Sequence, residues 1–243
     1  MLSFAAIAGF IINIFSLGIL FKLFAVAVVL ISILLVFKSK FGPVLATSLV
    51  PIITNTKSPT TMLIILAVAF ILYYIFKKLN LDRFVFTDFA PNAKQSLSLI
   101  YCIIVVFWLM LCFTFKVAGI CAVPPVLVIF FELIHKKHYP YKLYIKHVVA
   151  LTLISTVSVV TLLYFKNIPI VLLINFAFAG LFLWTLKLHK MIPAYALCFL
   201  PMLFPAGTEP YFPQAVFAMA TVLFGINYIL KFKETKALKE SAA

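Results

Sequence analysis

The sequence predicts an all-α membrane protein, a polytopic transmembrane helical bundle of about nine or ten segments in three repeated three-segment units. Its composition is the first reason: 65% of the 243 residues are hydrophobic and only 11% are charged, whereas soluble domains carry about a quarter charged residues. Apolar runs of the ~20 residues that cross a hydrocarbon core recur along the chain. The third reason is a set of prolines that recur at nearly constant spacing.

The N-terminal membrane unit is predicted to cover residues 1–78, with an extra segment before the first repeat. Up to Phe37 the only charged residue is Lys22, so this stretch forms either one element or two helices that break between Gly18 and Lys22. A polar linker, predicted to be cytoplasmic, follows at 79–95. The expected elements of the unit are, in order, 2–17, 23–37, a short segment at 43–54, and a span at 60–76.

The second membrane region is predicted at 96–231 and contains the second and third repeats. Residues 232–243, which are rich in lysine, are predicted to form a solvated cytoplasmic tail. The expected elements of the region are 96–115, a short segment at 120–134, 143–165, 168–186, a short segment at 187–201, and 213–230.

Prolines mark the same place in each predicted unit. Pro43 and Pro59 match Pro125 and Pro140 at shifts of 82 and 81 residues, and they match Pro193 and Pro213 at shifts of 150 and 154. The alternative is that prolines simply punctuate membrane helices. The prolines given a structural role in the short segments are Pro43, Pro51, Pro125, Pro193 and Pro201.

Loop charges indicate an orientation. Residues 77–96 and 135–146 hold four cations each, whereas 166 is a single lysine and 205–212 hold none. Cytoplasmic loops carry an excess of Lys and Arg, which places the C-terminus in the cytoplasm and inverts the middle unit. Inverted repeats are typical of transporters. We therefore expect a multi-pass protein of a bacterial plasma membrane.

The short segments carry the candidate binding residues. Broken helices at membrane depth line sites in transporters, although a proline also simply bends a packed helix. Hydroxyls, helix N-termini and nearby lysines suit a small anion, but the lysines also serve as positive-inside anchors. The candidate substrate-binding residues are Thr47, Ser48, Thr54, Asn55, Tyr195, Thr208, Lys40 and Lys190.

Glu132 is the only acid inside an apolar segment, which makes it a functional candidate. An i,i+4 ion pair with Lys136 at the interface is the alternative. The four cysteines lie in apolar runs without metal-ligand spacing, and no catalytic motif is present. We expect no enzyme activity, no metal and no cofactor. The lysines lie between apolar runs, so nucleic acid is not an expected partner.

Two segments resemble the HPP family of integral membrane proteins. Pro140 and His147 keep the spacing of seven in the family segment Pro-Arg-Asn-x-x-Gly-Gly-His, and Pro193, Ala194 and Ala196 match the second Pro and both Ala of His-Pro-Pro-Ala-Gly-Ala. The His, first Pro and Gly of that second motif are absent. The resemblance covers about residues 97–231. It implies a multi-span membrane protein, and nitrite transport is associated with plastid members.

The function predicted from these observations is a transporter or channel-like protein for a small solute, with a small anion as a candidate. The alternative is a non-transporting accessory or structural subunit that packs with a membrane partner. The expected partners are the lipid bilayer and a small solute. A second copy of the chain or another membrane protein is compatible with either function.

Overall fold

The computed structural model describes residues 2–36, 48–49, 51–52, 67, 74, 95–114, 123–136, 139–165, 167–203, 207 and 209–240. Every regular element in these ranges is a helix, and no strand occurs in them. The all-α prediction is confirmed for this part of the chain. The chain divides into two compact units, Met1–Val106 and Phe107–Ala243, which are described separately.

The first unit begins with two helices, α1 (Leu2–Ile14) and α2 (Ile19–Val36), which pack against each other. The N-terminal stretch is therefore two elements. The chain breaks at residues 15–18, and α2 begins at Ile19, before Lys22 rather than after it. The amide of Lys22 donates to the carbonyl of Gly18 at 3.1 Å, which closes the first turn of α2.

The second unit contains α7 (Pro124–Ile134), α8 (Tyr141–Tyr164), α9 (Ile168–Thr185) and α10 (Phe212–Glu240). Three 3₁₀ segments join α9 to α10: η1 (Ile192–Cys198), η2 (Leu200–Leu203) and η3 (Glu209–Tyr211). A further helix, α6 (Gln95–Thr114), crosses the boundary between the two units.

The chain starts these helices with residues suited to a first turn. Pro124 and Pro125 open α7, where a missing N–H costs nothing because the first amides have no helical partner. Pro140, with φ of −71° and ψ of 153°, precedes α8 in an extended conformation. The side chain of Asn167 caps α9 by accepting from the amide of Ile170 at 3.3 Å.

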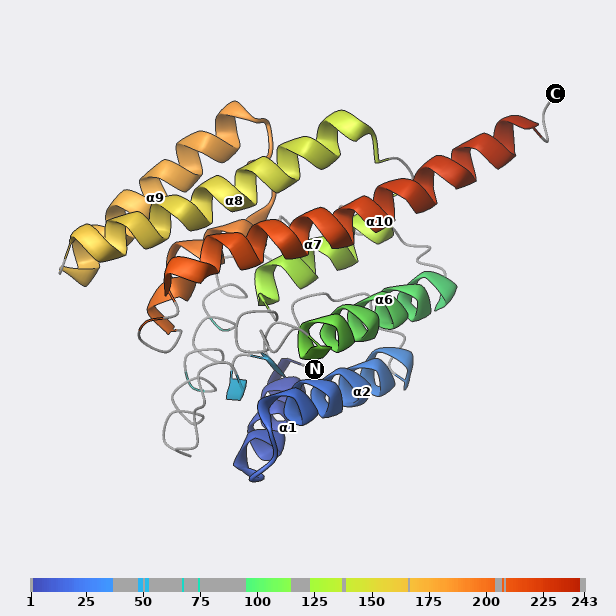
Figure 1. Cartoon of the computed structure of the whole chain (residues 1–243), viewed down its shortest axis with the longest axis horizontal. Coiled ribbons are helices and arrows are strands. Elements are labelled where there is room, and N and C mark those ends of the chain that lie inside the picture. The colour runs from blue at the N-terminus through green and yellow to red at the C-terminus, as the bar shows by residue number, and fades with distance from the viewer. Residues whose placement is uncertain are drawn as a thin grey trace. The chain divides into compact units, whose positions relative to one another are not determined.

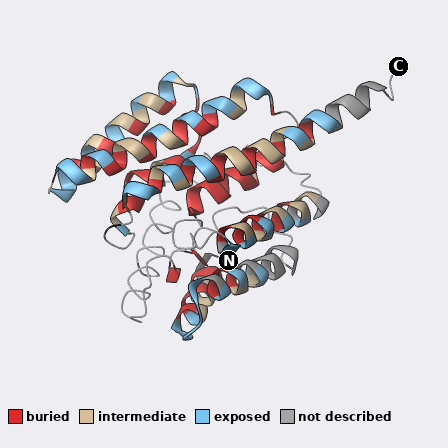
Figure 2. Ribbon diagram, viewed as in Figure 1, coloured by how far each residue is buried: buried red, intermediate tan, exposed pale blue. Residues whose placement is uncertain are grey.

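The core of the second unit forms where α8, α10 and α7 meet. In Figure 1, α8 and α10 run antiparallel, with α9 beside α8 and α7 behind α10, and the contacts between these helices agree with that arrangement. Every residue of α7 except Glu132 is buried, as the red ribbon in Figure 2 shows. Segment η1 packs against α7, α8 and α9.

Three helical stretches of the described chain are long and apolar enough to cross a membrane: Tyr141–Tyr164, Ile168–Thr185 and Glu209–Lys233. They carry exposed large apolar side chains, among them Leu163, Leu173 and Trp184. Exposure of this apolar area to water would be unfavourable. The three stretches therefore indicate a membrane protein.

Helix α10 continues past the expected last span and through residues 232–240 of the predicted tail, as far as Glu240. Lys231, the last residue of the predicted membrane region, is buried with 7% of its surface exposed. One predicted element differs from the structure. The short segment at 187–201 is not an α-helix: it forms a turn followed by the 3₁₀ turns of η1 and η2.

Candidate binding site around the Pro193–Pro201 segment

The segment from Pro193 to Pro201 enters the helix cluster in a 3₁₀ conformation. Pro193 lies in the first turn of η1, and Pro201 lies in η2. Proline has no N–H, so Pro201 cannot bond the carbonyl four residues earlier and a continuous α-helix is interrupted there. Ala194, Leu197 and Cys198 are nevertheless fully buried. Irregular backbone therefore lies inside the packed unit, where its polar groups need partners.

A buried polar cluster supplies one such partner. Asn175 of α9 donates from Nδ2 to the carbonyl oxygen of Cys198 at 3.1 Å, and its Oδ1 lies 2.6 Å from the hydroxyl of Thr161 on α8. The thiol of Cys198 lies 3.5 Å from the carbonyl oxygen of Asn175. These contacts join α8, α9 and η1. Amide and hydroxyl groups thus replace the helical hydrogen bond that the segment lacks.

Ser158 lies one turn before Thr161 on the same helix. It is 1% exposed, and its hydroxyl has no hydrogen-bond partner among the residues that the structure describes. Leaving a buried hydroxyl unpaired costs about 1–3 kcal/mol. The hydroxyl of Ser158 is therefore a candidate group for binding a small polar ligand, one turn from Thr161 on the same helix.

Tyr195 is the one predicted binding residue within η1. It is half-buried, and its ring stacks on that of Phe176, with centroids 6.4 Å apart and planes 12° apart. A Cβ built on Gly180 would lie 4.0 Å from the Tyr195 hydroxyl, an ordinary van der Waals contact, so the hydroxyl lies close to α9 at this point. The ring consequently lies along α9, next to the entry of the segment.

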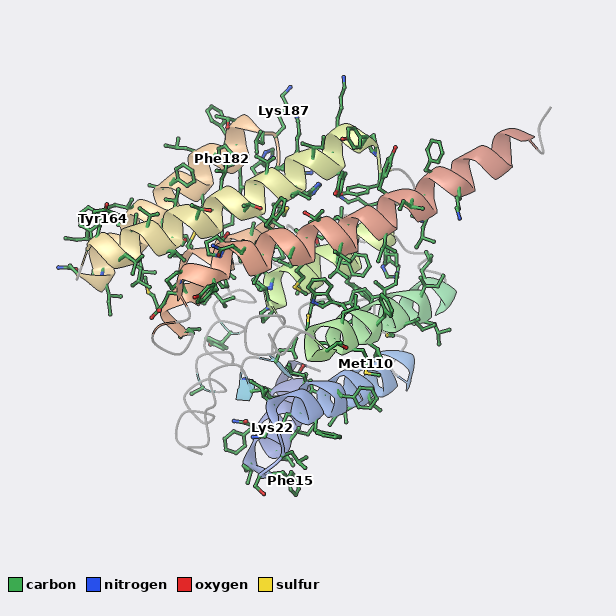
Figure 3. All side chains as sticks on the ribbon, viewed as in Figure 1. Phe15, Lys22, Met110, Tyr164, Phe182 and Lys187 are labelled. Atoms are coloured by element: carbon green, nitrogen blue, oxygen red, sulfur yellow. The ribbon has the colours of Figure 1, made fainter. Side chains whose placement is uncertain are left out.

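Lys190 is exposed in the turn that precedes η1. Lys187, at the start of the same turn, has a φ of 60°, and its side chain points away from the helices (Figure 3). The predicted cationic approach to the segment therefore faces outward. Neither side chain lies within the buried cluster.

Ser48 and Pro51 lie in the first unit, where both are buried. A Cβ on Gly9 of α1 would overlap the carbonyl oxygen of Ser48, so the two backbones are in close contact. Asn13 donates from Nδ2 to the carbonyl oxygen of Pro51 at 2.9 Å. The amino group of Lys22, labelled in Figure 3, lies 3.0 Å from Oδ1 of Asn13.

The other predicted residues divide into two groups. Pro125 is buried in the first turn of α7, and Glu132 is the half-buried residue of that helix. Within the described chain, no ion pair joins Glu132 to Lys136, so the i,i+4 pair is not formed. Outside the described residues lie Lys40, Pro43, Thr47, Thr54, Asn55 and Thr208.

The sequence reasoning missed Thr161 and Asn175, which hold the segment, and it missed the buried Ser158. A signal for them exists: Ser155, Ser158 and Thr161 recur every three residues in an apolar span, and Asn175 is the only amide in its helix. Intramembrane polar groups at helical spacing face the protein interior. In the described ranges, no group of three His, Cys, Asp or Glu residues could hold a metal ion.

The fold and this site define a helical membrane protein with a buried, proline-marked 3₁₀ segment. No family model, no curated protein and no solved structure matches the chain. The resemblance to the HPP family stays a prediction.

Proposed function

We propose that the chain is a multi-pass transporter or channel-like protein of a bacterial plasma membrane that moves a small solute past the η1 segment. The observation that carries the proposal is the buried 3₁₀ backbone at Ile192–Cys198, held by Asn175, whose partner Thr161 lies one turn from the unpartnered hydroxyl of Ser158. At membrane depth, non-helical backbone is tolerated only where protein or a water-filled cavity surrounds it. Such breaks are where transporters bind their substrates.

Helix ends and prolines that recur at nearly constant shifts support this proposal. Helix α1 ends at Ile14 and α8 at Tyr164, a shift of 150 residues, and α2 and α9 both span 18 residues at a shift of 149. Pro51 and Pro201 are also 150 residues apart. The end of the first helix, the whole of the second helix and the later proline therefore recur at shifts of 149–150 residues, although α1 has 13 residues and α8 has 24.

A similar contact occurs in both regions. Asn13 donates to the carbonyl of Pro51, and Asn175 donates to the carbonyl of Cys198. In each case a buried carboxamide fixes a backbone carbonyl of the proline-marked segment, although Asn13 lies on the first helix of its pair and Asn175 on the second. We include the three-unit repeat, the inverted middle unit and the cytoplasmic C-terminus in the proposal on this basis and on the loop charges.

A small anion is the solute class that we propose. The net charge of +14 and the exposed lysines beside the segment would raise the local anion concentration. Hydroxyl and amide donors can then hold an anion without a full countercharge. The resemblance to the HPP family adds nitrite to the solutes worth testing.

Flux into liposomes that contain the purified protein tests this proposal. We expect uptake of formate or nitrite above that of empty vesicles, and a several-fold reduction in Ser158→Ala and Tyr195→Ala. Thr185→Ala is the matched control because Thr185 is an exposed hydroxyl residue at the end of α9. Equal flux in all three variants would exclude the site. No flux of formate, nitrite, chloride or glycerol would favour the accessory-subunit function instead.

A further inference from the structure

A second polar site lies on α10, away from η1. Asn227 is completely buried, and neither Nδ2 nor Oδ1 of its side chain has a hydrogen-bond partner among the described residues. An amide buried without partners costs more than almost any other neutral side chain, and each unpaired group costs about 1–3 kcal/mol. A leucine of similar size would avoid this cost, so the carboxamide needs a reason other than stability.

The surroundings of Asn227 offer a further acceptor. Phe224, one turn earlier on α10, meets the ring of His147 edge-on, with centroids 6.1 Å apart and planes 80° apart. Nδ1 of His147 lies 2.7 Å from the carbonyl oxygen of Leu143. A carbonyl can only accept, so Nδ1 carries the proton and Nε2 keeps a lone pair. His147 is itself buried, and the Tyr139 hydroxyl lies 3.5 Å from the same Nδ1.

We propose that Asn227, together with His147, whose ring meets Phe224 one turn earlier on α10, binds a small planar group that presents one donor and one acceptor side by side. An undissociated carboxylic acid and a primary amide share this chemistry. Either one would accept from Nδ2 and donate to Oδ1 of Asn227, which satisfies both unpaired atoms in a two-bond contact. Nε2 of His147 is an acceptor for a second N–H.

A carboxylate fits this site less well. It would accept from Nδ2 but would place negative charge against Oδ1 of Asn227 and the lone pair of His147. The neutral and the anionic ligand therefore give opposite outcomes in a binding experiment.

Ligand-observed saturation-transfer NMR on the full-length protein in detergent tests the proposal. The probes are acetamide at pH 7.5, acetate at pH 7.5, and acetic acid at pH about 4.5, where a carboxylic acid is partly undissociated. We expect transfer to acetamide and to acetic acid but not to acetate. Transfer to acetamide alone would restrict the site to amides, and transfer to acetic acid alone would restrict it to undissociated acids.

Two variants of α10 give the test its control. Asn227→Leu should reduce saturation transfer to acetamide at least fivefold. The same variant should raise the melting temperature of the protein. Thr221→Val also removes a buried hydrogen-bonding atom without a partner from α10, and it should leave the acetamide signal unchanged. His147→Phe keeps the aromatic contact but removes Nε2, and it should at least halve the signal.

The proposal is overturned if acetamide and acetic acid both show no transfer, if Asn227→Leu binds acetamide as the wild type does, or if acetate binds in preference. The experiment measures binding without transport. It can therefore fail while the flux proposal holds, and the reverse is equally possible.

Discussion

Oδ1 of Asn175 lies 2.6 Å from the hydroxyl of Thr161, and both residues are buried between α8 and α9. The same carboxamide holds the carbonyl of Cys198. One side chain therefore fixes two helices and the non-helical segment between α9 and α10. Its removal leaves a buried hydroxyl and a buried carbonyl without this partner.

Asn175→Leu is expected to destabilise the protein by about 1–3 kcal/mol, the cost of leaving a buried polar group unsatisfied. Unfolding in mixed micelles by increasing SDS measures the change. Asn167→Ala is the matched control, because Asn167 is an exposed cap whose loss costs about 1 kcal/mol or less. A double-mutant cycle with Thr161→Val should show coupling between the two side chains. Additive effects would mean that the 2.6 Å contact contributes nothing.

Gly9→Ala is expected to destabilise the first unit by about 1–3 kcal/mol, because the new Cβ would overlap the backbone of Ser48, which cannot rotate away. Gly18→Ala is the control: a Cβ there meets nothing within 4 Å, and alanine should be neutral or slightly stabilising. Thermal unfolding of the two variants checks the difference. Equal effects would contradict the close approach of α1 and Ser48.

Asn13→Leu is expected to cost about 1.5–3 kcal/mol, the range for hydrogen bonds to charged groups. The variant loses the bond to the Pro51 carbonyl and the acceptor that lies 3.0 Å from the Lys22 amino group. Lys22→Met should lower the free energy of unfolding by less than Asn13→Leu does. Lys22→Met removes the buried charge, whereas Asn13→Leu keeps that charge buried with one acceptor fewer. SDS-induced unfolding ranks the two variants. The reverse order would show that the charge of Lys22 is stabilised mainly by other groups.

Tyr139 lies in the connection between α7 and α8, and its burial leads us to expect a loss of stability at alkaline pH. Burial raises the pKa of its phenol above the usual 10.0, chiefly by desolvation and further through the neighbouring Tyr144. The unfolded chain ionises first, so this contribution is complete below pH 10. It then falls by up to about 1.4 kcal/mol for each pH unit above that value.

Melting temperatures from pH 8 to pH 11 check this prediction. Tyr139→Phe should show a shallower decline than the wild type above pH 10. Tyr164→Phe should not, because Tyr164 is 82% exposed at the end of α8. Identical slopes in all three proteins would rule out Tyr139 as the source.

The sequence predicted several helices closely, for reasons that lie in the residues themselves. The span expected at 168–186 is α9, at Ile168–Thr185, because Asn167 and Pro169 start it and an apolar run fills it. The short segment expected at 120–134 is α7, which begins only at its prolines. A break near Gly18 was one of the two alternatives for the N-terminal stretch, and the structure has it, although α2 begins before Lys22. Local capping and proline chemistry determine such boundaries.

The site was predicted only in part. The proline-marked segment was singled out, and Tyr195 lies in it, but Asn175 and Thr161 are 14 residues apart and belong to different helices. A hydrogen bond across that separation depends on how α8 and α9 rotate against each other. Lys231 shows the same limitation, since its burial comes from packing and not from the lysine-rich sequence around it.

The class of protein follows from the amino-acid sequence alone, because apolar content and run length decide between water and lipid without reference to any tertiary contact. The positions where proline prevents an α-helix follow from the sequence as well. What those breaks do depends on the packing of the folded chain. That packing places the Cys198 carbonyl beside Asn175, the Pro51 carbonyl beside Asn13, and the Asn227 carboxamide where no side chain satisfies it. The physical reason is that buried polar groups are paired through space, so their partners follow from packing rather than from order along the chain.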